Sequence, residues 1–322
     1  MPNVLCSVST RGRTHTTLPM ALQAIINQTQ KPDKLVIFDD NDDPQDLRSD
    51  PLYQQLFYML QAKEIPWEWL YAGKKGQHHN HQIAKWMGYD WVWRVDDDAL
   101  PEPNVLQNLL KHTGPTIGGV GGSVLTPPNS FEGAASTGKI EHIYIEPNAQ
   151  WQRIKRKQEV EHLHCTFLYR AGVYDYNLAL SRVAHREETL FTYGLHKKGY
   201  KLLVVPNAVT WHLKAPSGGI RMENRQELFN HDEQIFRNTM AFRDQTIVVL
   251  NSGMGDHIVF SHVLPHIKNP VVFGCYPEIV PSKSIAEAQS LFGDIDMFNI
   301  YGKMHHWKWK SSLEDAYRKM YT

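Results

Sequence analysis

The sequence predicts an α/β fold in which a mixed, mostly parallel sheet is followed by a second, smaller α/β unit. Two observations support this fold class. Apolar segments of strand length alternate with segments of helical periodicity, first within residues 4–40 and again after residue 246. An apolar, aromatic and β-branched run, residues 91–95, also leads directly into three carboxylates, and open α/β sheets bind ligands at such strand ends.

The first 40 residues have a strand–helix–strand pattern. Residues 4–8 are an apolar strand, apolar side chains recur at helical spacing from Leu18 to Ile26, and residues 35–38 are a second buried strand. Strands joined in this way run parallel, and the crossover is right-handed in almost all proteins. The polar residues after both strands are therefore expected at the same edge of the sheet as residues 96–98.

These polar residues have the chemistry of a nucleotide site. Thr10, Arg11 and Arg13 offer hydrogen-bond donors to a phosphate or to a base edge. Asp39 or Asp40 offers an acceptor to a base N–H or to a ribose hydroxyl. The alternative for the two aspartates is a structural role in which they only cap a turn.

Asp96, Asp97 and Asp98 follow the strand at residues 91–95. Three adjacent carboxylates repel one another unless a positive group joins them. Hard oxygen ligands suit Mg²⁺ or Mn²⁺, and these ions commonly bridge to phosphates. We therefore expect a metal–diphosphate site built on Asp96 and Asp98. The alternative is a solvated acidic turn that ends the strand.

More strands and helices are expected up to residue 215. Helices are expected at 51–61, 82–87, 105–110 and 189–198, and strands at 67–70, 114–122, 140–145, 162–169 and 201–205. Gly199 stops the last helix, and residues 207–212 continue the last strand as an extended segment. Residues 73–81, 127–130 and 133–138 have the composition of loops. Four of the five residues at 153–157 are basic, which favours a solvated face over a binding patch.

A change of domain is expected between residues 216 and 245. Residues 216–219 are rich in Pro, Gly and Ser, which is typical of a mobile loop, and a polar stretch follows up to residue 243. From residue 246, strands at 247–250, 271–275 and 297–301 alternate with helices at 258–267, 284–292 and 311–321. This alternation is typical of a small Rossmann-like domain. The predicted domains are 1–215, a loop and linker at 216–245, and 246–322.

The composition is that of a soluble globular protein, with 42% hydrophobic and 21% charged residues. The formal net charge is zero, which disfavours a partner held by bulk electrostatics, such as duplex nucleic acid. Cys6, Cys165 and Cys275 are far apart and form no disulfide framework or thiolate metal motif, so a reducing compartment fits. The sequence has neither a signal peptide nor an apolar run of the ~20 residues that span a bilayer. A cytoplasmic location is therefore expected.

Seven sequence features occur in the order and spacing of a known enzyme family. They are the strand and turn at 4–13, Asn27-Gln28-Thr29 at a helix end, the strand at 36–40 with its two aspartates, Lys75-Gly76 with Asn80, Asp96-Asp97-Asp98 with Pro103, Glu187-Glu188 ahead of Gly199-Tyr200, and Val205-Pro206-Asn207-Ala208-Val209. Over residues 1–215 the chain therefore resembles the family 2 glycosyltransferases of the GT-A fold. Residues 96–98 match the DXD motif of that family.

The resemblance implies a metal-dependent inverting glycosyltransferase that uses a nucleotide-diphosphate sugar, with UDP as the expected nucleotide. It implies that Glu188 is the base that deprotonates the acceptor hydroxyl, with Glu187 in support. Asp98 and His212 would hold Mn²⁺ or Mg²⁺, and Asp96 would contact the metal or the ribose. The nucleotide-sugar site would comprise Thr10, Arg11, Arg13, Asp39, Asp40, Asp96 and Asp97. The family has Glu-Asp where this chain has two glutamates, so the base is one methylene longer here.

Other interpretations stay open at this point. Glu187 and Glu188 are also explained as an acidic helix start favoured by the helix dipole, and His212 as an ordinary residue at a strand end. A non-catalytic nucleotide- or carbohydrate-binding module on the same scaffold is the second functional hypothesis. A sugar-1-phosphate nucleotidyltransferase is a third, disfavoured because no N-terminal run of glycines precedes a lysine-bearing turn.

The sequence leaves the acceptor open. A surface polysaccharide or a lipid-linked glycan is the usual acceptor in the family, and a modified DNA base, bound through residues 153–157, is a less favoured alternative. The turn at Gly253-Met254-Gly255-Asp256 has a fainter resemblance to the opening of a GT-B glycosyltransferase domain, of which only one half would be present. We expect the C-terminal domain to serve acceptor recognition or homo-oligomerisation.

Overall fold

The computed structural model describes residues 2–127, 155–219 and 225–292, and the chain divides into two compact units. The larger unit comprises residues 1–177 and 181–229, and the smaller one comprises residues 178–180 and 230–322. The predicted domain limits at residues 215 and 245 stay predictions. The strands expected at 140–145 and 297–301, the helix expected at 311–321 and Arg153 of the basic run lie outside the described residues.

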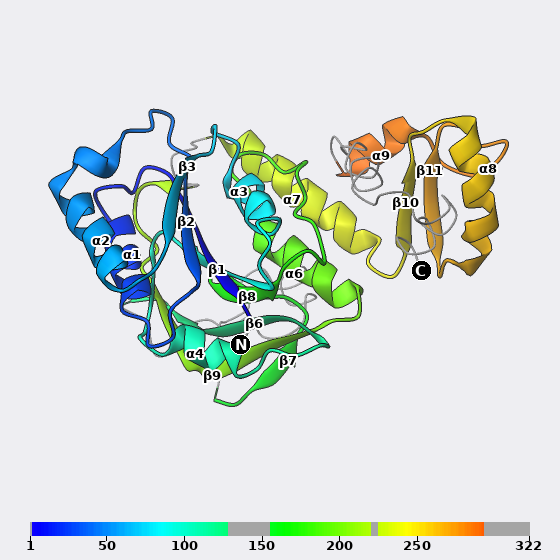
Figure 1. The fold of residues 1–322 in the computed structure, drawn as a ribbon. Coiled ribbons are helices and arrows are strands. Elements are labelled where there is room, and N and C mark those ends of the chain that lie inside the picture. The colour runs from blue at the N-terminus through cyan, green and yellow to red at the C-terminus, as the bar shows by residue number, and fades with distance from the viewer. Residues whose placement is uncertain (1, 128–154, 220–224, 293–322) are drawn as a thin grey trace. The chain divides into compact units, whose positions relative to one another are not determined.

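Four parallel strands form one half of the sheet in the larger unit (Figure 1). In spatial order they are β3 (Trp67–Tyr71), β2 (Lys34–Asp39), β1 (Val4–Thr10) and β4 (Trp91–Asp96). Every residue of β1 is buried, as expected for an inner strand that is covered on both faces. These four strands confirm the ones expected near residues 4, 35, 67 and 91.

The other half of the sheet has mixed directions. Its longer strands are β8 (Phe167–Arg170), β6 (Ile117–Leu125) and β9 (Lys201–His212). β8 is antiparallel to β4 and β6, whereas β6 and β9 are parallel. Two short strands that the sequence analysis missed, β5 (Ala99–Pro101) and β7 (Gln158–Val160), are antiparallel to β9. The expectation of a mixed, mostly parallel sheet is confirmed.

Helices cover both faces of this sheet (Figure 1). They are α1 (Leu18–Ile26), α2 (Pro51–Ala62), α3 (Gln77–Ala84), α4 (Val105–Leu110) and α6 (Glu187–Lys197), with the short 3-10 helix η1 (Leu47–Ser49) before α2. Alternate side chains of β1 point to opposite faces. Cys6 and Val8 share a hydrophobic core with α1, whereas Ser7 contacts α3 on the other face.

The helix expected at 82–87 is wrong in its limits, because α3 spans Gln77–Ala84 and includes residues expected to be loop. The side chains that α3 buries include His78, Asn80 and His81. Asn80 donates a hydrogen bond to Ser9 (2.8 Å), and His81 Nδ1 lies 3.1 Å from the Ser7 hydroxyl. The buried face of the helix is therefore polar, and no hydrophobic periodicity marked its true start.

The limits expected for one strand and for one polar stretch were also wrong. Of the strand expected at 162–169, only residues 167–169 pair in the sheet, as part of β8, since Cys165 has a φ of +59° and interrupts the extended backbone. The polar stretch expected up to residue 243 contains a 16-residue helix, α7 (Gln226–Ala241). Its buried apolar residues are few and lie among charged ones, which hid the helix in the sequence.

The smaller unit has two parallel strands with a helix on each face. Its elements are β10 (Thr246–Leu250), α8 (Met254–Val263), the 3-10 helix η3 (Leu264–His266), β11 (Pro270–Gly274) and α9 (Ile285–Phe292). Val248 and Leu250 pack against α8, whereas Val249 packs against α9, so the two helices lie on opposite faces.

The α-helix expected at 258–267 has different limits from those of α8. It begins four residues earlier, within the glycine-rich turn, and it ends before Pro265, which lies in η3. In the part of the chain that the structure describes, no helix is both long enough and apolar enough to cross a membrane.

Candidate active site

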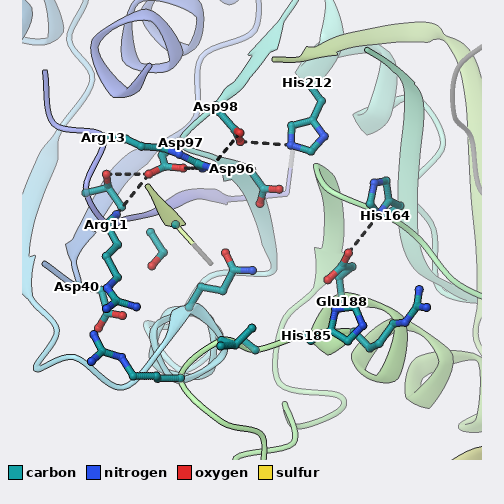
Figure 2. A pocket seen from close by; sticks show the side chains of 18 residues that line it. Arg11, Arg13, Asp40, Asp96, Asp97, Asp98, His164, His185, Glu188 and His212 are labelled. Carbon is teal, nitrogen blue, oxygen red and sulfur yellow. Dashed lines mark hydrogen bonds and ion pairs between the residues drawn. The ribbon is translucent and has the colours of Figure 1, made fainter. Parts of the chain in front are cut away.

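A pocket lies where β1, β4 and β9 of the larger unit end, and Figure 2 shows the side chains that line it. The lining residues come from the end of β1 and its following turn, from the acidic end of β4, from β9, from the segment before α6 and from α6 itself. They include Ser9, Thr10, Arg11, Arg13, Asp40, Gln77, Asp96, Asp97, Asp98, His164, Arg182, His185, Arg186, Glu188 and His212. The structure therefore brings most of the predicted site residues to one place.

Asp97, the middle aspartate, is held in the turn after β1. Its carboxylate accepts hydrogen bonds from the Thr10 hydroxyl (2.8 Å) and from Arg13 Nη1 (2.5 Å), and only 4% of the residue is exposed. Burial raises the pKa of Asp97 to about 6, against the lowering effect of the Arg13 charge. Thr10 and Arg13 therefore fix the loop of the acidic motif.

Asp98 lies beside His212 because of the pairing between β5 and β9. Ala99 is the register partner of His212, so the preceding aspartate is brought to the histidine. Asp98 Oδ1 lies 3.3 Å from His212 Nε2, and Asp98 Oδ2 lies 3.2 Å from Arg13 Nη2 and accepts a hydrogen bond from the Ala215 backbone N–H (3.0 Å). Burial alone would raise the pKa of Asp98, but His212 and Arg13 hold it below its usual value.

Asp96 has a different cationic partner. Arg94 Nη2 donates to Asp96 Oδ1 at 2.9 Å, and Arg94 itself is fully buried in β4. The other terminal nitrogen of Arg94 bonds Glu187 Oε1 at 2.5 Å. One buried guanidinium thus joins the acidic end of β4 to the start of α6.

Glu187 and Glu188 occupy the first turn of α6, yet their environments differ. Glu187 is 1% exposed and, besides the ion pair with Arg94, accepts a hydrogen bond from Gln77 (3.1 Å). Glu188 lines the pocket, and its Oε1 lies 3.1 Å from His164 Nδ1. Burial would raise the pKa of Glu188, but the hydrogen bond and charge of His164 lower it overall. Glu188 is therefore ionised at neutral pH and points into the pocket.

The two aspartates at the end of β2 also differ. Asp39 is absent from the described lining of the pocket, and its carboxylate accepts hydrogen bonds from Asn41 (2.6 Å) and from the Trp69 indole (3.3 Å). Asp40 lines the pocket, but both of its oxygens accept backbone N–H groups, from Lys75 and Gly76, at 3.0 Å. Asp40 therefore holds the turn that starts α3.

Several lining residues were missed by sequence reasoning, namely Gln77, His164, Arg182, His185 and Arg186. Arg94 was also missed as a partner of the site, although one signal was available. An arginine inside an apolar strand is expected to have a buried acidic partner, since charged residues are rarely buried unpaired. The sequence did not indicate that this partner is Glu187, 93 residues away.

The donor atoms around Asp96, Asp98 and His212 fit a divalent cation. Carboxylate oxygens and an imidazole suit Mn²⁺ or Mg²⁺. His212 Nδ1 is buried without a hydrogen-bond partner in the described structure. Burial lowers the pKa of His212, but the nearby Asp98 carboxylate raises it overall, so the histidine is protonated more readily than usual. The excess of negative charge at this end of the pocket would be reduced by a bound cation.

Comparison with known proteins gives relatives of low identity. No protein-family model matches the chain. The galactofuranosyltransferase GlfT1 of Mycolicibacterium smegmatis is 30% identical over 115 residues, which are 33% of this chain and 34% of GlfT1. The matched region thus spans about a third of that relative's length.

Solved structures resemble a larger part of the chain. TarS 1–349 of S. aureus, in complex with UDP-GlcNAc, has a TM-score of 0.50 at 13% identity. The match covers 74% of this chain and 66% of the TarS chain. GalNAc-T7, with UDP, GalNAc and Mn²⁺, has a TM-score of 0.52 at 11% identity. The match covers 96% of this chain and 58% of the GalNAc-T7 chain. Both neighbours are GT-A glycosyltransferases, and this chain has the GT-A fold. The expected fold is therefore confirmed.

Proposed function

We propose that this protein is a metal-dependent inverting glycosyltransferase that moves a sugar from a UDP-linked donor to an acceptor hydroxyl. One observation carries the proposal. The DXD-like aspartates with His212, and the ionised carboxylate of Glu188, line the same pocket, although the aspartates and Glu188 lie in opposite halves of the sequence. A transferase needs both groups, one for the departing diphosphate and one for the incoming hydroxyl.

The relatives support the same type of reaction. GlfT1 is a galactofuranosyltransferase, TarS binds UDP-GlcNAc, and GalNAc-T7 binds UDP with Mn²⁺. A UDP-sugar and Mn²⁺ or Mg²⁺ are therefore the donor and cofactor we propose.

Asp96, Asp98 and His212 would hold the cation, which would supply Lewis-acid stabilisation to the negative charge that develops on the departing diphosphate. Arg13 contributes in two ways, because it holds Asp97 and also pairs with Asp98. Thr10, Arg11 and Arg13 line the pocket wall where the nucleotide would bind. Asp39 is better explained by its structural hydrogen bonds than by nucleotide contact.

Glu188 would take the proton of the acceptor hydroxyl. As the O–H bond breaks, the acceptor oxygen bonds the anomeric carbon, and the bond from that carbon to the diphosphate oxygen breaks with its electron pair leaving on the nucleotide. His164 orients the carboxylate through its hydrogen bond to Oε1. Glu187, buried with Arg94, would act as a support for α6 and not as a second base.

The decisive experiment compares Glu188→Gln with the wild type. We expect loss of about 10²–10⁴-fold in transfer, because the amide cannot accept the proton, with UDP-sugar binding retained. Transfer and slow donor hydrolysis are measured with Mn²⁺ over a panel of UDP-sugars, and binding by calorimetry. Glu159→Gln is the matched control, since Glu159 is an exposed carboxylate that pairs with Lys201 at 3.2 Å and does not line the pocket. Wild-type turnover in Glu188→Gln would assign the base elsewhere.

A non-catalytic binding module is the second candidate, and one observation favours it. The lowered pKa of Glu188 makes its carboxylate a weaker base than an isolated glutamate. If the wild-type protein binds UDP-sugars with Mn²⁺ but neither transfers nor hydrolyses them, the binding module is the correct interpretation.

A further inference from the structure

The buried thiol of Cys165 lies next to the acidic site. Among the described residues, Asp96, Cys165 and His212 each offer one ligand atom, and these three atoms all lie within 4.8 Å of one another. Cys165 is 1% exposed and is a free cysteine. An oxygen, a sulfur and an imidazole nitrogen therefore lie close enough together to bind one ion. This set of donor atoms is typical of a transition-metal site.

Donor softness favours Cys165 over Asp98 as the third ligand for a soft cation, because a thiolate sulfur binds such an ion more tightly than a carboxylate oxygen does. Both oxygens of Asp98 already have partners, His212 on Oδ1 and Arg13 with Ala215 N–H on Oδ2. Asp96 uses only Oδ1 for Arg94, and a carboxylate has a second oxygen. His212 Nδ1 is buried and makes no hydrogen bond within the described residues.

The backbone at Cys165 is held in an unusual conformation. Its φ of +59° is in the left-handed region, which a residue with a side chain rarely adopts. Such conformations persist where the surrounding structure imposes them, and they cluster at functional sites. The sulfur also lies 3.6 Å from the Thr166 hydroxyl, whose oxygen accepts from the Asp96 backbone N–H. Cys165 is thus tied to the end of β4.

We infer that Asp96, Cys165 and His212 form a site for thiophilic divalent cations such as Zn²⁺, Co²⁺ or Cd²⁺. Binding breaks the S–H bond of Cys165, releases its proton to solvent and forms a sulfur–metal bond, with no change of oxidation state. Thiolate and imidazole ligands bind these ions more tightly than they bind Mg²⁺. The inference rests on the proposed function only in that Asp96 and His212 would serve both kinds of cation.

Cobalt titration tests this site directly, because a sulfur–Co²⁺ bond gives a charge-transfer absorption in the near ultraviolet. We expect this band to saturate at one Co²⁺ per chain in the wild type and to be lost in Cys165→Ser. Cys6→Ser and Cys275→Ser are the controls: Cys6 is a buried thiol in β1, and Cys275 is an exposed thiol in the smaller unit. Both variants should keep the band.

Three results would overturn the inference. They are a wild type without the band, a Cys165→Ser protein that keeps it, and loss of the band in Cys275→Ser. Circular dichroism checks that Cys165→Ser folds. Should it not fold, His212→Gln takes its place, with cobalt affinity expected to fall at least about tenfold. Unchanged cobalt affinity in His212→Gln contradicts the site.

The same proteins separate this inference from the proposed function. UDP-sugar transfer is measured with Mg²⁺ or Mn²⁺ in place of cobalt. A cobalt band without any transfer leaves the metal site and removes the proposed function. Transfer without a cobalt band leaves the proposed function and removes the thiolate site.

Discussion

Asp96, Asp97 and Asp98 are consecutive in the chain, yet each carboxylate has its own partners. Arg94 pairs with Asp96, Arg13 and Thr10 hold Asp97, and His212 faces Asp98. The mutual repulsion of the three charges is therefore relieved separately for each residue. In this arrangement the second carboxylate anchors the turn after β1, and the first and third are the ones we propose as ligands.

Arg94 connects the acidic motif to a second part of the candidate site. It is fully buried, and it bridges Asp96 at the end of β4 and Glu187 at the start of α6. Because Glu188 follows directly, the guanidinium fixes the distance between the proposed donor site and the proposed base. We regard Arg94 as a positioning residue.

Arg94→Lys keeps the positive charge but cannot bond both carboxylates with a rigid fork. We expect kcat to fall by about 100-fold, the usual cost of a small displacement of reacting groups, with folding retained. The matched control is Arg170→Lys, since Arg170 is a planar cation stacked on Trp91 that donates to backbone carbonyls of Gly114 and Ile117. Equal loss of kcat in both variants, measured as UDP-sugar transfer, would mean that Arg94 acts only through overall packing.

At the scale of elements, the turn before α3 is held by a carboxylate at the end of β2. Gly76, at the N-terminal boundary of α3, has a φ of +97°, and its N–H and that of Lys75 both bond Asp40. Burial raises the pKa of Asp40, although these two backbone hydrogen bonds oppose the shift. A residue expected to bind nucleotide therefore also fixes a helix start.

Asp40→Asn should destabilise the larger unit by about 1.5–3 kcal/mol, because one charged hydrogen bond to a backbone N–H is lost. Thermal unfolding followed by circular dichroism measures this change. Asp42→Asn is the control, since Asp42 is half exposed and solvent weakens its ion pairs with Arg11 and Arg182. If Asp40→Asn unfolds at the wild-type temperature but binds UDP more weakly, Asp40 acts on the nucleotide alone.

The pairing of β6 with β9 depends on one glycine. A Cβ atom built on Gly122 would lie 1.8 Å from the carbonyl oxygen of Ala208, and the register of the two strands shifts at this point. β9 continues from there to His212, so the close approach of the two backbones helps to set the position of the histidine.

Gly122→Ala should destabilise the larger unit by about 3 kcal/mol, the upper end for an overpacked position, because the two backbones must separate. Gly114→Ala is the control: its added Cβ would meet only Ile117, at 3.8 Å. Differential scanning calorimetry should show a large drop in unfolding temperature for Gly122→Ala alone. An unfolding temperature within a degree of wild type would contradict the close approach.

Sequence reasoning located most elements because hydrophobic periodicity reflects burial. It failed at α3, whose buried side chains His78, Asn80 and His81 are polar, and at β5 and β7, which are too short for a pattern. The candidate site was partly predictable, since the acidic strand end and Glu188 are local features. Its cationic partners were not, because the contact between Arg94 and Glu187 depends on how distant segments fold together.

At the scale of the whole molecule, the chain consists of two units with separate cores. The core of the larger unit includes β1, β4 and α1, whereas the smaller unit buries residues of β10, β11, α8 and α9. The lining residues of the pocket all belong to the larger unit. Ligand binding should therefore stabilise only one of the two units.

Calorimetry should resolve two unfolding transitions. Saturating UDP with Mn²⁺, at about 100 times the Kd, should stabilise the transition of the larger unit by roughly 2.7 kcal/mol and leave the other transition unchanged. Removal of Mn²⁺ with EDTA should reverse this stabilisation. In the Asp98→Ala variant, UDP with Mn²⁺ should not stabilise the larger unit. A single transition that moves as a whole would show that the two units unfold together.

The pairing of Ala99 with His212 also bears on how the protein is made. A nascent chain that has emerged as far as residue 200 already carries all three aspartates but lacks the strand end that reaches Asp98. Contacts between such distant positions raise the contact order and form late, because a long loop must close first. The candidate site is therefore expected to be completed late in folding, after all residues of the parallel half of the sheet have been synthesised.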